Sequence, residues 1–510
     1  MSIRRLGPAE PAFTDRNENT GIPITEAAFP VPFPSRLEFN PPVHGTWNIV
    51  HIGMLLPQAH QIYVCSENCM RGVVMTAAEM NALDRFSCVT LEERDLYNGN
   101  LEEITLEGIT DVLGKLAARR TPAQMPRAVL VFPVCLHHFM GCDLRYVYGE
   151  LEKRFPAIRF VHCWMDPIMQ KSGPTPDQKL RRAMMDLIPG QKTERSSQSS
   201  IPGQKTERSE LHSIPGQKTQ DRLVFLGDVL ALDPESELMR LAKVVNEGFL
   251  RSEDGSTGRQ IMQIQDCCSL DEYLAMSDAG VIVTRTAVAE PSLRATARRL
   301  GAKPMFLPFT FRYEEIREAL QGVAALFAAD HKPEAETIRK RLAEAGIDFA
   351  REEAACEAAL ADALALIGDT PIAVDQIAVE RPLGLCRLLA SHGFQVKEVY
   401  LDRFNDSEQE DHKWLREHLP SLMVCSTIQP EGRVLHGEGL STGREHYLAI
   451  GPKAAWYNET PHFVNMVYDG GLWGYSGIRK LAADMCDAYL HGKDTRELVP
   501  RKGLGCDCIL

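Results

Sequence analysis

The stretch Pro382–Leu401, PLGLCRLLASHGFQVKEVYL, indicates the fold class of this 510-residue chain. Its first half has apolar residues at helical spacing and stops at Gly393, and its second half is rich in residues that favour strands. TPIAVDQI, which begins at Thr370, precedes it as a further apolar run. Strand, helix, glycine and strand in this order predict a Rossmann-type β–α–β unit with parallel strands.

The same alternation recurs from about residue 45 onward, and it predicts an α/β chain of three Rossmann-like, doubly wound domains with parallel sheets. The segment 335–367 is expected to be one long helix closed by Gly368. The predicted strands are QIYVCS, AVLVFPV, IRFVHC, DRLVFLGDV, QIMQIQ, AGVIVTRT, PMFLPF, SLMVCS, HYLAIG and HFVNMVYDGG.

Composition suggests where the domains begin and end. A 13-residue motif occurs three times, starting at Ile188, Ile201 and Ile214, and its Pro-Gly pair and few apolar residues indicate a surface linker. The expected organisation is an N-terminal arm at 1–44, a first α/β domain at 45–187, the repeat linker at 188–220, a second α/β domain at 221–370, and a third with the C-terminal tail at 371–510.

The net charge of −13 disfavours nucleic acid and anionic membrane surfaces as partners. Lys179, Arg181 and Arg182 are read as a solvated basic face beside the linker. The first residues lack the apolar core of a secretory signal, and the longest apolar runs fall short of the roughly 18 residues of a membrane span. These features predict a cytoplasmic protein.

The 14 cysteines lack the spacing and secreted context of a disulfide framework, so reduced thiols and a few metal-bound thiolates are expected. Prenylation is excluded because Asp507 stands fourth from the end. Cys506 and Cys508 form a metal or redox candidate, with a frayed tail as the alternative. The adjacent pair Cys267–Cys268 does not match a zinc ribbon.

Cys65, Cys69 and Cys135 are the main candidates for chemistry, as ligands of an iron–sulfur cluster. Cys65 and Cys69 stand at i and i+4 and would share a face if SENCMRGVV begins a helix, whose N-terminus would stabilise thiolate sulfur. Cys135 ends a strand of the same predicted sheet. The alternative reading makes all three buried thiols.

Three further residues lie near these cysteines in the predicted sheet. His137 and His138 follow Cys135 and are candidates for hydrogen bonding to sulfur or for proton transfer, or are satisfied surface histidines. Cys163 ends the next strand and is a possible fourth ligand. No GxxxxGK[ST] or GxGxxG motif occurs, so the chain has no phosphate loop or dinucleotide fingerprint of its own.

The order of these segments resembles the nitrogenase component 1 superfamily across about residues 45–490. The matching stretches are CSENCMRG, VFPVCLHHFMGCDL, SDAGVIVTRT, PLGLCRLLASHGFQVKEVYLD and YDGGLWGYSGIRKLAADM. The resemblance implies three domains around a central cleft and an iron–sulfur cluster, four-iron or P-cluster-like, held by Cys69 and Cys135. The family's first such cysteine would fall near Gly45–Thr46, where no thiol exists, and Cys65 is its possible substitute.

The resemblance also implies partners: an ATP-dependent reductase iron protein and a homologous subunit in a homo- or hetero-oligomer. It places Arg285 in the cleft as a candidate to orient an anionic substrate or cofactor, with a surface salt bridge as the alternative. Val283 and Trp473 occupy the positions of the family's two iron–molybdenum cofactor ligands, so this cofactor is not expected.

The leading hypothesis from sequence is a nitrogenase-like reductase subunit that passes electrons through an iron–sulfur cluster to an unassigned small substrate. A second hypothesis is a non-catalytic scaffold on which a metallocluster is assembled, or a partner subunit of the catalytic chain. A third is a metal-free protein that binds a sugar or another small molecule.

Overall fold

The stretch Pro382–Leu401 forms the unit that its pattern predicts. In the computed structural model, β10 (Pro371–Asp375) and β11 (Gln395–Tyr400) pair in parallel, and α14 (Pro382–Ser391) connects them. Proline suits the first turn of α14, where its missing N–H leaves no hydrogen bond unmade. Gly393, with φ +91°, turns the chain after the helix, a conformation that glycine adopts without steric cost. The residues described are 21–33, 49–163, 165, 174–190, 222–247, 261–326, 335–427 and 446–494.

Three sheets are present in this part of the chain, and their strand orders confirm the predicted α/β class. The first is β3-β2-β4-β5, the second β7-β6-β8-β9, and the third β1-β12-β11-β10-β13-β14; every pairing is parallel except that of β1 with β12. The other strands are β1 (Gly21–Pro23), β2 (Ala59–Cys65), β3 (Phe86–Thr90), β4 (Ala128–Pro133), β5 (Arg159–His162), β6 (Arg222–Phe225), β7 (Ile261–Gln263), β8 (Ala279–Thr284), β9 (Lys303–Phe306), β12 (Met423–Cys425), β13 (Leu448–Ile450) and β14 (Phe463–Val464).

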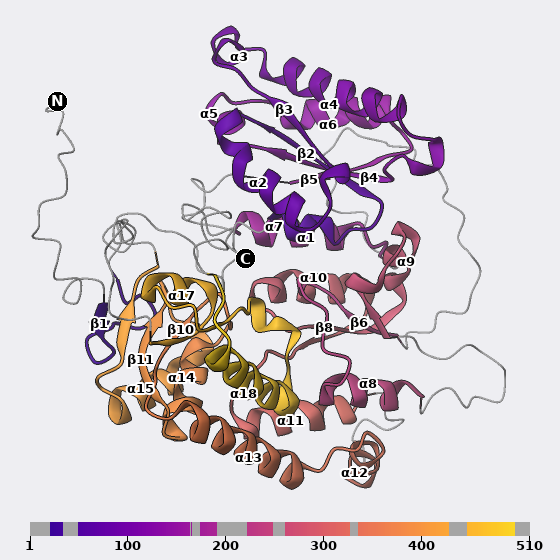
Figure 1. Ribbon diagram of the computed structural model, residues 1–510. Helices are drawn as coiled ribbons and strands as arrows, with labels where there is room; N and C mark the ends of the chain where they lie inside the picture. Colours follow the sequence, from indigo (N-terminus) through magenta and orange to yellow (C-terminus); the bar gives the residue numbers. More distant parts are fainter. Residues whose placement is uncertain are drawn as a thin grey trace, which may run out of the picture.

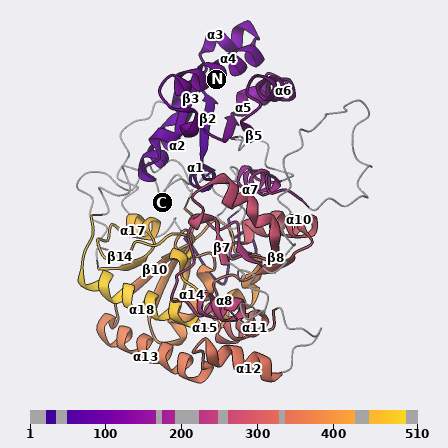
Figure 2. The same cartoon turned by 90° about the vertical axis from the view of Figure 1, so that its right-hand side faces the viewer.

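The described connections between consecutive strands of each parallel sheet contain helices, as parallel pairing requires. The described residues within 49–190, 222–367 and 371–494 carry the first, second and third sheets and are called the first, second and third blocks. Figures 1 and 2 show the first block above the other two. The α-helices are α1 (Ile49–Met54), α2 (Glu67–Glu79), α3 (Glu93–Asn98), α4 (Leu101–Ala117), α5 (Cys135–Phe139), α6 (Leu144–Arg154), α7 (Pro176–Asp186), α8 (Glu237–Glu247), α9 (Leu270–Leu274), α10 (Glu290–Leu300), α11 (Tyr313–Ala324), α12 (Ala335–Glu344), α13 (Phe349–Ile367), α15 (Gln409–His418), α17 (Pro452–Asn458) and α18 (Gly474–Leu490).

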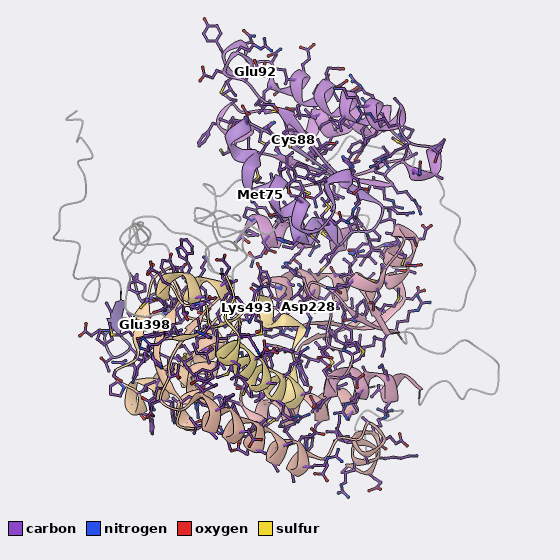
Figure 3. All side chains as sticks on the ribbon, in the orientation of Figure 1. Met75, Cys88, Glu92, Asp228, Glu398 and Lys493 are labelled. Carbon is purple, nitrogen blue, oxygen red and sulfur yellow. The ribbon has the colours of Figure 1, made fainter. Side chains whose placement is uncertain are left out.

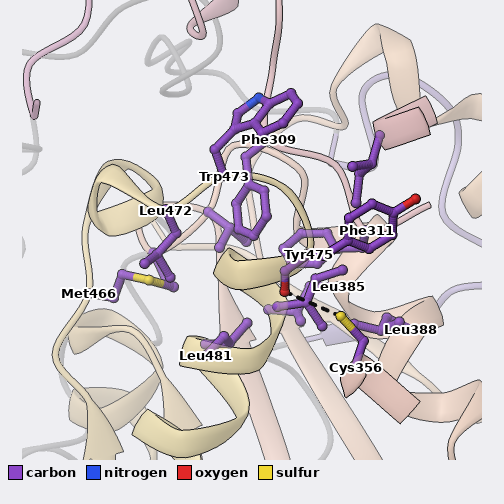
Figure 4. Packing of buried hydrophobic residues seen from close by; sticks show 14 of the residues in the cluster. Phe309, Phe311, Cys356, Leu385, Leu388, Met466, Leu472, Trp473, Tyr475 and Leu481 are labelled. Carbon is purple, nitrogen blue, oxygen red and sulfur yellow. Dashed lines mark hydrogen bonds between the residues drawn. The ribbon is translucent and has the colours of Figure 1, made fainter. Parts of the chain in front are cut away.

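The second sheet divides two large hydrophobic cores. Side chains alternate across a strand, and Leu223 and Phe225 of β6 join the core shared with the third block. Val224, between them, joins the core shared with the first block. Figure 4 shows part of the former core, where Trp473 and Tyr475 lie among apolar side chains of α13, α14 and α18. The second and third blocks are therefore held together by one continuous core.

The predicted N-terminal arm is described only at residues 21–33, and these pack on the third block. β1 adds an antiparallel edge strand to β12, and the Ile24 N–H donates to the carbonyl of Leu422 at 2.8 Å. Phe29 stacks on Phe404 with ring centroids 5.6 Å apart. All of the repeat linker after Gly190 lies outside the described residues, as do Cys506 and Cys508.

The single long helix predicted for residues 335–367 is wrong, because the structure has two helices there. α12 ends before Gly346, whose φ of +68° stops a helix, and Asp348 then caps α13 by accepting the N–H of Arg351 at 3.1 Å. β3 and β1 were not among the predicted strands. Within the described ranges, no helix is long and apolar enough to cross a membrane.

Candidate functional site

Two of the predicted cysteines lie at the carboxyl ends of two neighbouring strands of the first sheet. Cys65 is the last residue of β2, and Cys135 is the first residue of α5, two residues after the end of β4. The two strands are neighbours, with Val64 opposite Pro133. Strand order reverses between β2 and β4, because the chain leaves β2 for β3 on one side and later enters β4 on the other. Such a switch point, at the carboxyl ends of parallel strands, is where α/β sheets bind ligands.

Cys65 and Cys69 do not share a helix face, so this prediction is wrong. Cys65 belongs to the strand, Ser66 has extended dihedral angles, and α2 begins only at Glu67. Cys69 lies in the first turn of α2 and is exposed, and the Ser66 hydroxyl donates to its Sγ at 3.3 Å. Cys65 is wholly buried, and this burial is the main reason why its pKa is raised to about 12. Only Cys69 of this pair is open to the surface.

Cys163 follows β5, but it lies in the core and is not exposed at the sheet edge. Its side chain has no exposed surface, its S–H donates to the carbonyl of Val161 at 3.4 Å, and burial raises its pKa well above the ordinary value. Cys163 therefore has the environment of a small hydrophobic side chain. The structure does not place it with Cys69 and Cys135.

The two histidines after Cys135 differ in environment. His137 is 1% exposed, its Nε2 lies 3.1 Å from Oγ1 of Thr105, and its Nδ1 accepts the backbone N–H of Val134 at 3.2 Å. Burial lowers the pKa of His137 to about 4, so the ring is neutral at pH 7. His137 anchors α5 to α4, whereas His138 is exposed.

Among the described residues, no three His, Cys, Asp or Glu side chains are grouped so that they could hold a metal ion. Cys69 and the half-buried Cys135 are the pair that opens to the surface at the switch point. Large apolar side chains are exposed on helices of the same block: Tyr97 at 92%, Phe139 at 64%, Tyr146 at 53% and Met140 at 47%.

Arg285 lies in a second site, at the switch point of the second sheet between β6 and β8. Its backbone N–H donates to Asp228 Oδ1 at 2.9 Å, and its Nε lies 3.5 Å from Asp228 Oδ2. Its Nη2 donates to the carbonyl of Leu230 at 2.5 Å. Arg285 is only 6% exposed, so the alternative of a surface salt bridge is wrong. Figure 3 labels Asp228 near the middle of the molecule, where the second and third blocks adjoin.

These residues line a partly open pocket, whose roughly 490 Å³ of space not filled by protein atoms includes open solvent. Arg181 of α7 also lines it, although sequence placed this residue on a solvated face. It is 4% exposed and its Nε donates to Asp177, which is also buried. The polar side chains of the pocket come from all three blocks: Arg181, Asp228, Arg285, Thr286, Gln376, Glu380, Tyr468 and Asp469.

Two carboxyl groups of the pocket, Glu380 and Asp469, went unnoticed in the sequence. Glu380 Oε1 accepts the backbone N–H of Ala287 at 2.7 Å, and the Glu380 backbone N–H donates to Asp469 Oδ1 at 3.0 Å. Burial and then the charge of Asp469 raise the pKa of Glu380 to about 8. Burial raises the pKa of Asp469 to about 6. Two neighbouring acids with separated pKa values are suited to donate and accept protons near neutral pH.

Asp469 is held by an unusual turn. Tyr468, Asp469, Gly470 and Gly471 have φ values of +48°, +59°, +59° and +76°. The backbone N–H groups of Tyr468 and Asp469 donate to the carbonyls of Ile377 and Ala378, both at 2.9 Å. Non-glycine residues in left-handed conformations store strain that surrounding structure must hold, and such strain gathers at functional sites.

Val283 and Trp473, which the resemblance aligns with the family's iron–molybdenum cofactor ligands, are core residues. Val283 of β8 and Trp473 before α18 are each 1% exposed and belong to the core shared by the second and third blocks. The Trp473 Nε1–H donates to the carbonyl of Leu307 at 2.9 Å. Neither side chain carries a metal-ligating atom.

No family model matches the sequence, and no curated protein matches it. Among solved structures, the fold is similar to a chain of nitrogenase Cp1 at pH 6.5, with 12% identity and a TM-score of 0.53 over 90% of this chain and 94% of that chain. A chain of nitrogenase Cp1 at pH 5 gives 11% identity and a TM-score of 0.53 over 94% and 97% of the two chains. The resemblance stated from sequence is thus confirmed at the level of architecture: nearly the whole of this chain has the fold of the nitrogenase Cp1 chains.

Proposed function

We propose that this chain is a subunit of a nitrogenase-like reductase in which Cys69 and Cys135 hold an iron–sulfur cluster shared with a second copy of the chain. The cluster receives electrons from an ATP-dependent iron protein. A small substrate is reduced in the pocket lined by Arg285, and its identity is not assigned. The cytoplasm is the proposed location.

The observation that carries this proposal is the placement of Cys69 and Cys135 at the switch point of the first sheet. Cubane iron–sulfur clusters are held by about four thiolates. One chain offers two exposed or half-exposed thiols there, so two chains related by twofold symmetry offer four. A thiol in the first turn of α2 also lies where backbone N–H groups favour negative charge.

The residues around the two cysteines have identifiable supporting roles. Ser66 donates a hydrogen bond to the Sγ of Cys69, which stabilises a thiolate there. Neutral His137 fixes the start of α5 and thus the position of Cys135. A bound cluster would accept and release one electron at a time at this end of the sheet.

The exposed apolar side chains of the first block favour binding of a second copy of the chain at this surface. Phe139 and Met140 end the helix that Cys135 begins, and Tyr146 lies on the next helix. Exposed aromatic and methionine side chains are enriched at protein interfaces. A cluster between two copies would bring these surfaces together, and a dimer is the expected oligomer.

The experiment is anaerobic purification followed by iron quantification and electron paramagnetic resonance of the reduced protein. Cys69→Ala and Cys135→Ala are expected to abolish or strongly alter the signal. Cys268→Ala is the matched control, because this cysteine is exposed but lies on the second block. Unchanged iron content and signal in both test variants would refute the assignment.

A second function, a scaffold or partner subunit without its own active site, is favoured by Val283 and Trp473. Both occupy ligand positions with core side chains, so a large metal cofactor would lack its usual anchors. Turnover of a small substrate by the purified chain with an iron protein would exclude the scaffold. Cluster transfer to another protein without turnover would support it.

A further inference from the structure

Glu380 and Asp469 are brought together by the third block, at the junction of all three. Glu380 follows β10, and Asp469 follows β14 in the left-handed turn. Both line the pocket, and the backbone of one residue donates to the carboxylate of the other. This arrangement fixes the two carboxyl groups beside the space that a ligand would occupy.

A second feature of the pocket points to a ligand there. Arg181 is 96% buried and lines the same space, and its Nη1 has no hydrogen-bond partner among the described residues. Its Nε is taken by Asp177. A buried guanidinium N–H without a partner is costly unless a ligand or water accepts it. The pocket thus has an unused donor in addition to its carboxyl pair.

Both negative and positive side chains surround Glu380. Carboxylates come from the turn after β14 and from the loop after β6, and guanidinium groups come from α7, from the end of β8 and from the start of α14. Each guanidinium group already faces a carboxylate, so none is reserved for Glu380. These groups are Asp469, Asp228, Arg181, Arg285 and Arg381, with Asp177, Asp228 and Glu315 as the partners of the arginines.

We propose that Glu380 is the proton donor of this pocket and that Asp469 returns the proton to it. This inference rests on the proposed reductase function. When a double bond of the ligand gains two electrons supplied by the iron protein, the O–H bond of Glu380 breaks and its proton bonds to one atom of that double bond. Asp469 passes a solvent proton to the resulting carboxylate, and a second transfer completes the addition of two electrons and two protons.

Infrared difference spectroscopy of the full chain tests the proposal without turnover. A carboxylic acid C=O band is expected to titrate near pH 8, and Glu380→Gln should remove it while keeping an acceptor for the Ala287 N–H. Glu408→Gln is the matched control. Glu408 is buried outside the pocket with a pKa also raised to about 8, so its variant should remove a separate band.

Asp469→Asn gives a second variant that should fold, because asparagine tolerates a left-handed conformation. Loss of its charge should lower the titration midpoint of Glu380, since that charge raises the pKa. A Glu380 that is ionised at pH 7 in the wild type would overturn the proposal. An unchanged midpoint in Asp469→Asn would also overturn it, because the two groups would then not be coupled.

Single-turnover reduction of the chain by an iron protein then tests proton transfer. Glu380→Gln should accept electrons as fast as the wild type but form reduced product about 10²–10⁴-fold more slowly. Product formation within threefold of the wild type would overturn the proposal. If the wild type accepts no electrons at all, the reductase function fails, and the infrared titration still decides whether Glu380 holds a proton.

Discussion

Replacing Gly471 with alanine should destabilise the chain more than any simple change of backbone preference would. Gly471 has φ +76°, and a Cβ built there would lie 2.4 Å from the backbone oxygen of Ala231. A left-handed conformation costs a non-glycine residue about 1–2 kcal/mol. Overpacking against an atom that cannot rotate away adds about 1–3 kcal/mol. The expected loss is therefore about 2–5 kcal/mol of unfolding free energy.

Gly99→Ala is the control for this prediction. Gly99 has a similar φ of +70°, but a Cβ there would meet nothing within 4 Å, so only the backbone cost of about 1–2 kcal/mol applies. The assay is urea unfolding followed by circular dichroism on both variants and the wild type. A loss in Gly471→Ala no greater than that in Gly99→Ala would refute the close packing of the turn against the second block, and with it the fixed position of Asp469.

Three further predictions concern stability. Glu237→Ala should cost about 1–3 kcal/mol by urea unfolding, because Glu237 is wholly buried and its loss leaves the backbone N–H of Ser476 without its acceptor, whereas Arg479 keeps its ion pair with Glu352; no loss of stability would contradict this. The pKa values of Glu408 and Glu380 are raised to about 8 from an ordinary 4.5, so between these pH values the folded chain binds more protons than the unfolded chain. The free energy of unfolding should therefore fall as pH rises through this window, by up to about 1.4 kcal/mol per pH unit for Glu408. Glu408→Gln should flatten that fall between about pH 6.5 and 8, and an unchanged slope would count against it. Ser269→Ala removes the N-cap of α9 and should lower the free energy of unfolding by about 1 kcal/mol, whereas no change would mean that the cap is replaced by water.

The local spacing of apolar residues and glycines was sufficient to predict the α/β architecture. The segment after Thr370 gave the correct order of strand, helix and strand, because apolar spacing and a glycine stop are local properties. Gly346 shows the limit of this reasoning: helical spacing continues on both sides of it, and only the backbone shows the break. β3 was missed because its residues are only partly buried and give no clear alternation.

The candidate sites were predicted only in part, because burial and long-range pairing cannot be read from one segment. Cys65 and Cys163 both follow the predicted pattern at strand ends, yet both lie in the core. Arg181 is in a basic run of sequence, but α7 packs between the first and second blocks and buries it. Glu380 and Asp469 are 89 residues apart in the chain, and only the fold brings them together. Their one signal in sequence was a position shortly after a strand, where parallel sheets present polar side chains.

We propose that two copies of this chain together hold one iron–sulfur cluster through Cys69 and Cys135. Native mass spectrometry of the anaerobically purified protein, combined with iron and acid-labile sulfide analysis, tests this arrangement. We expect a dimer with about four iron and about four sulfide per two chains, the content of one cubane cluster. An iron-free dimer, or a monomer that keeps a full cluster, would contradict it.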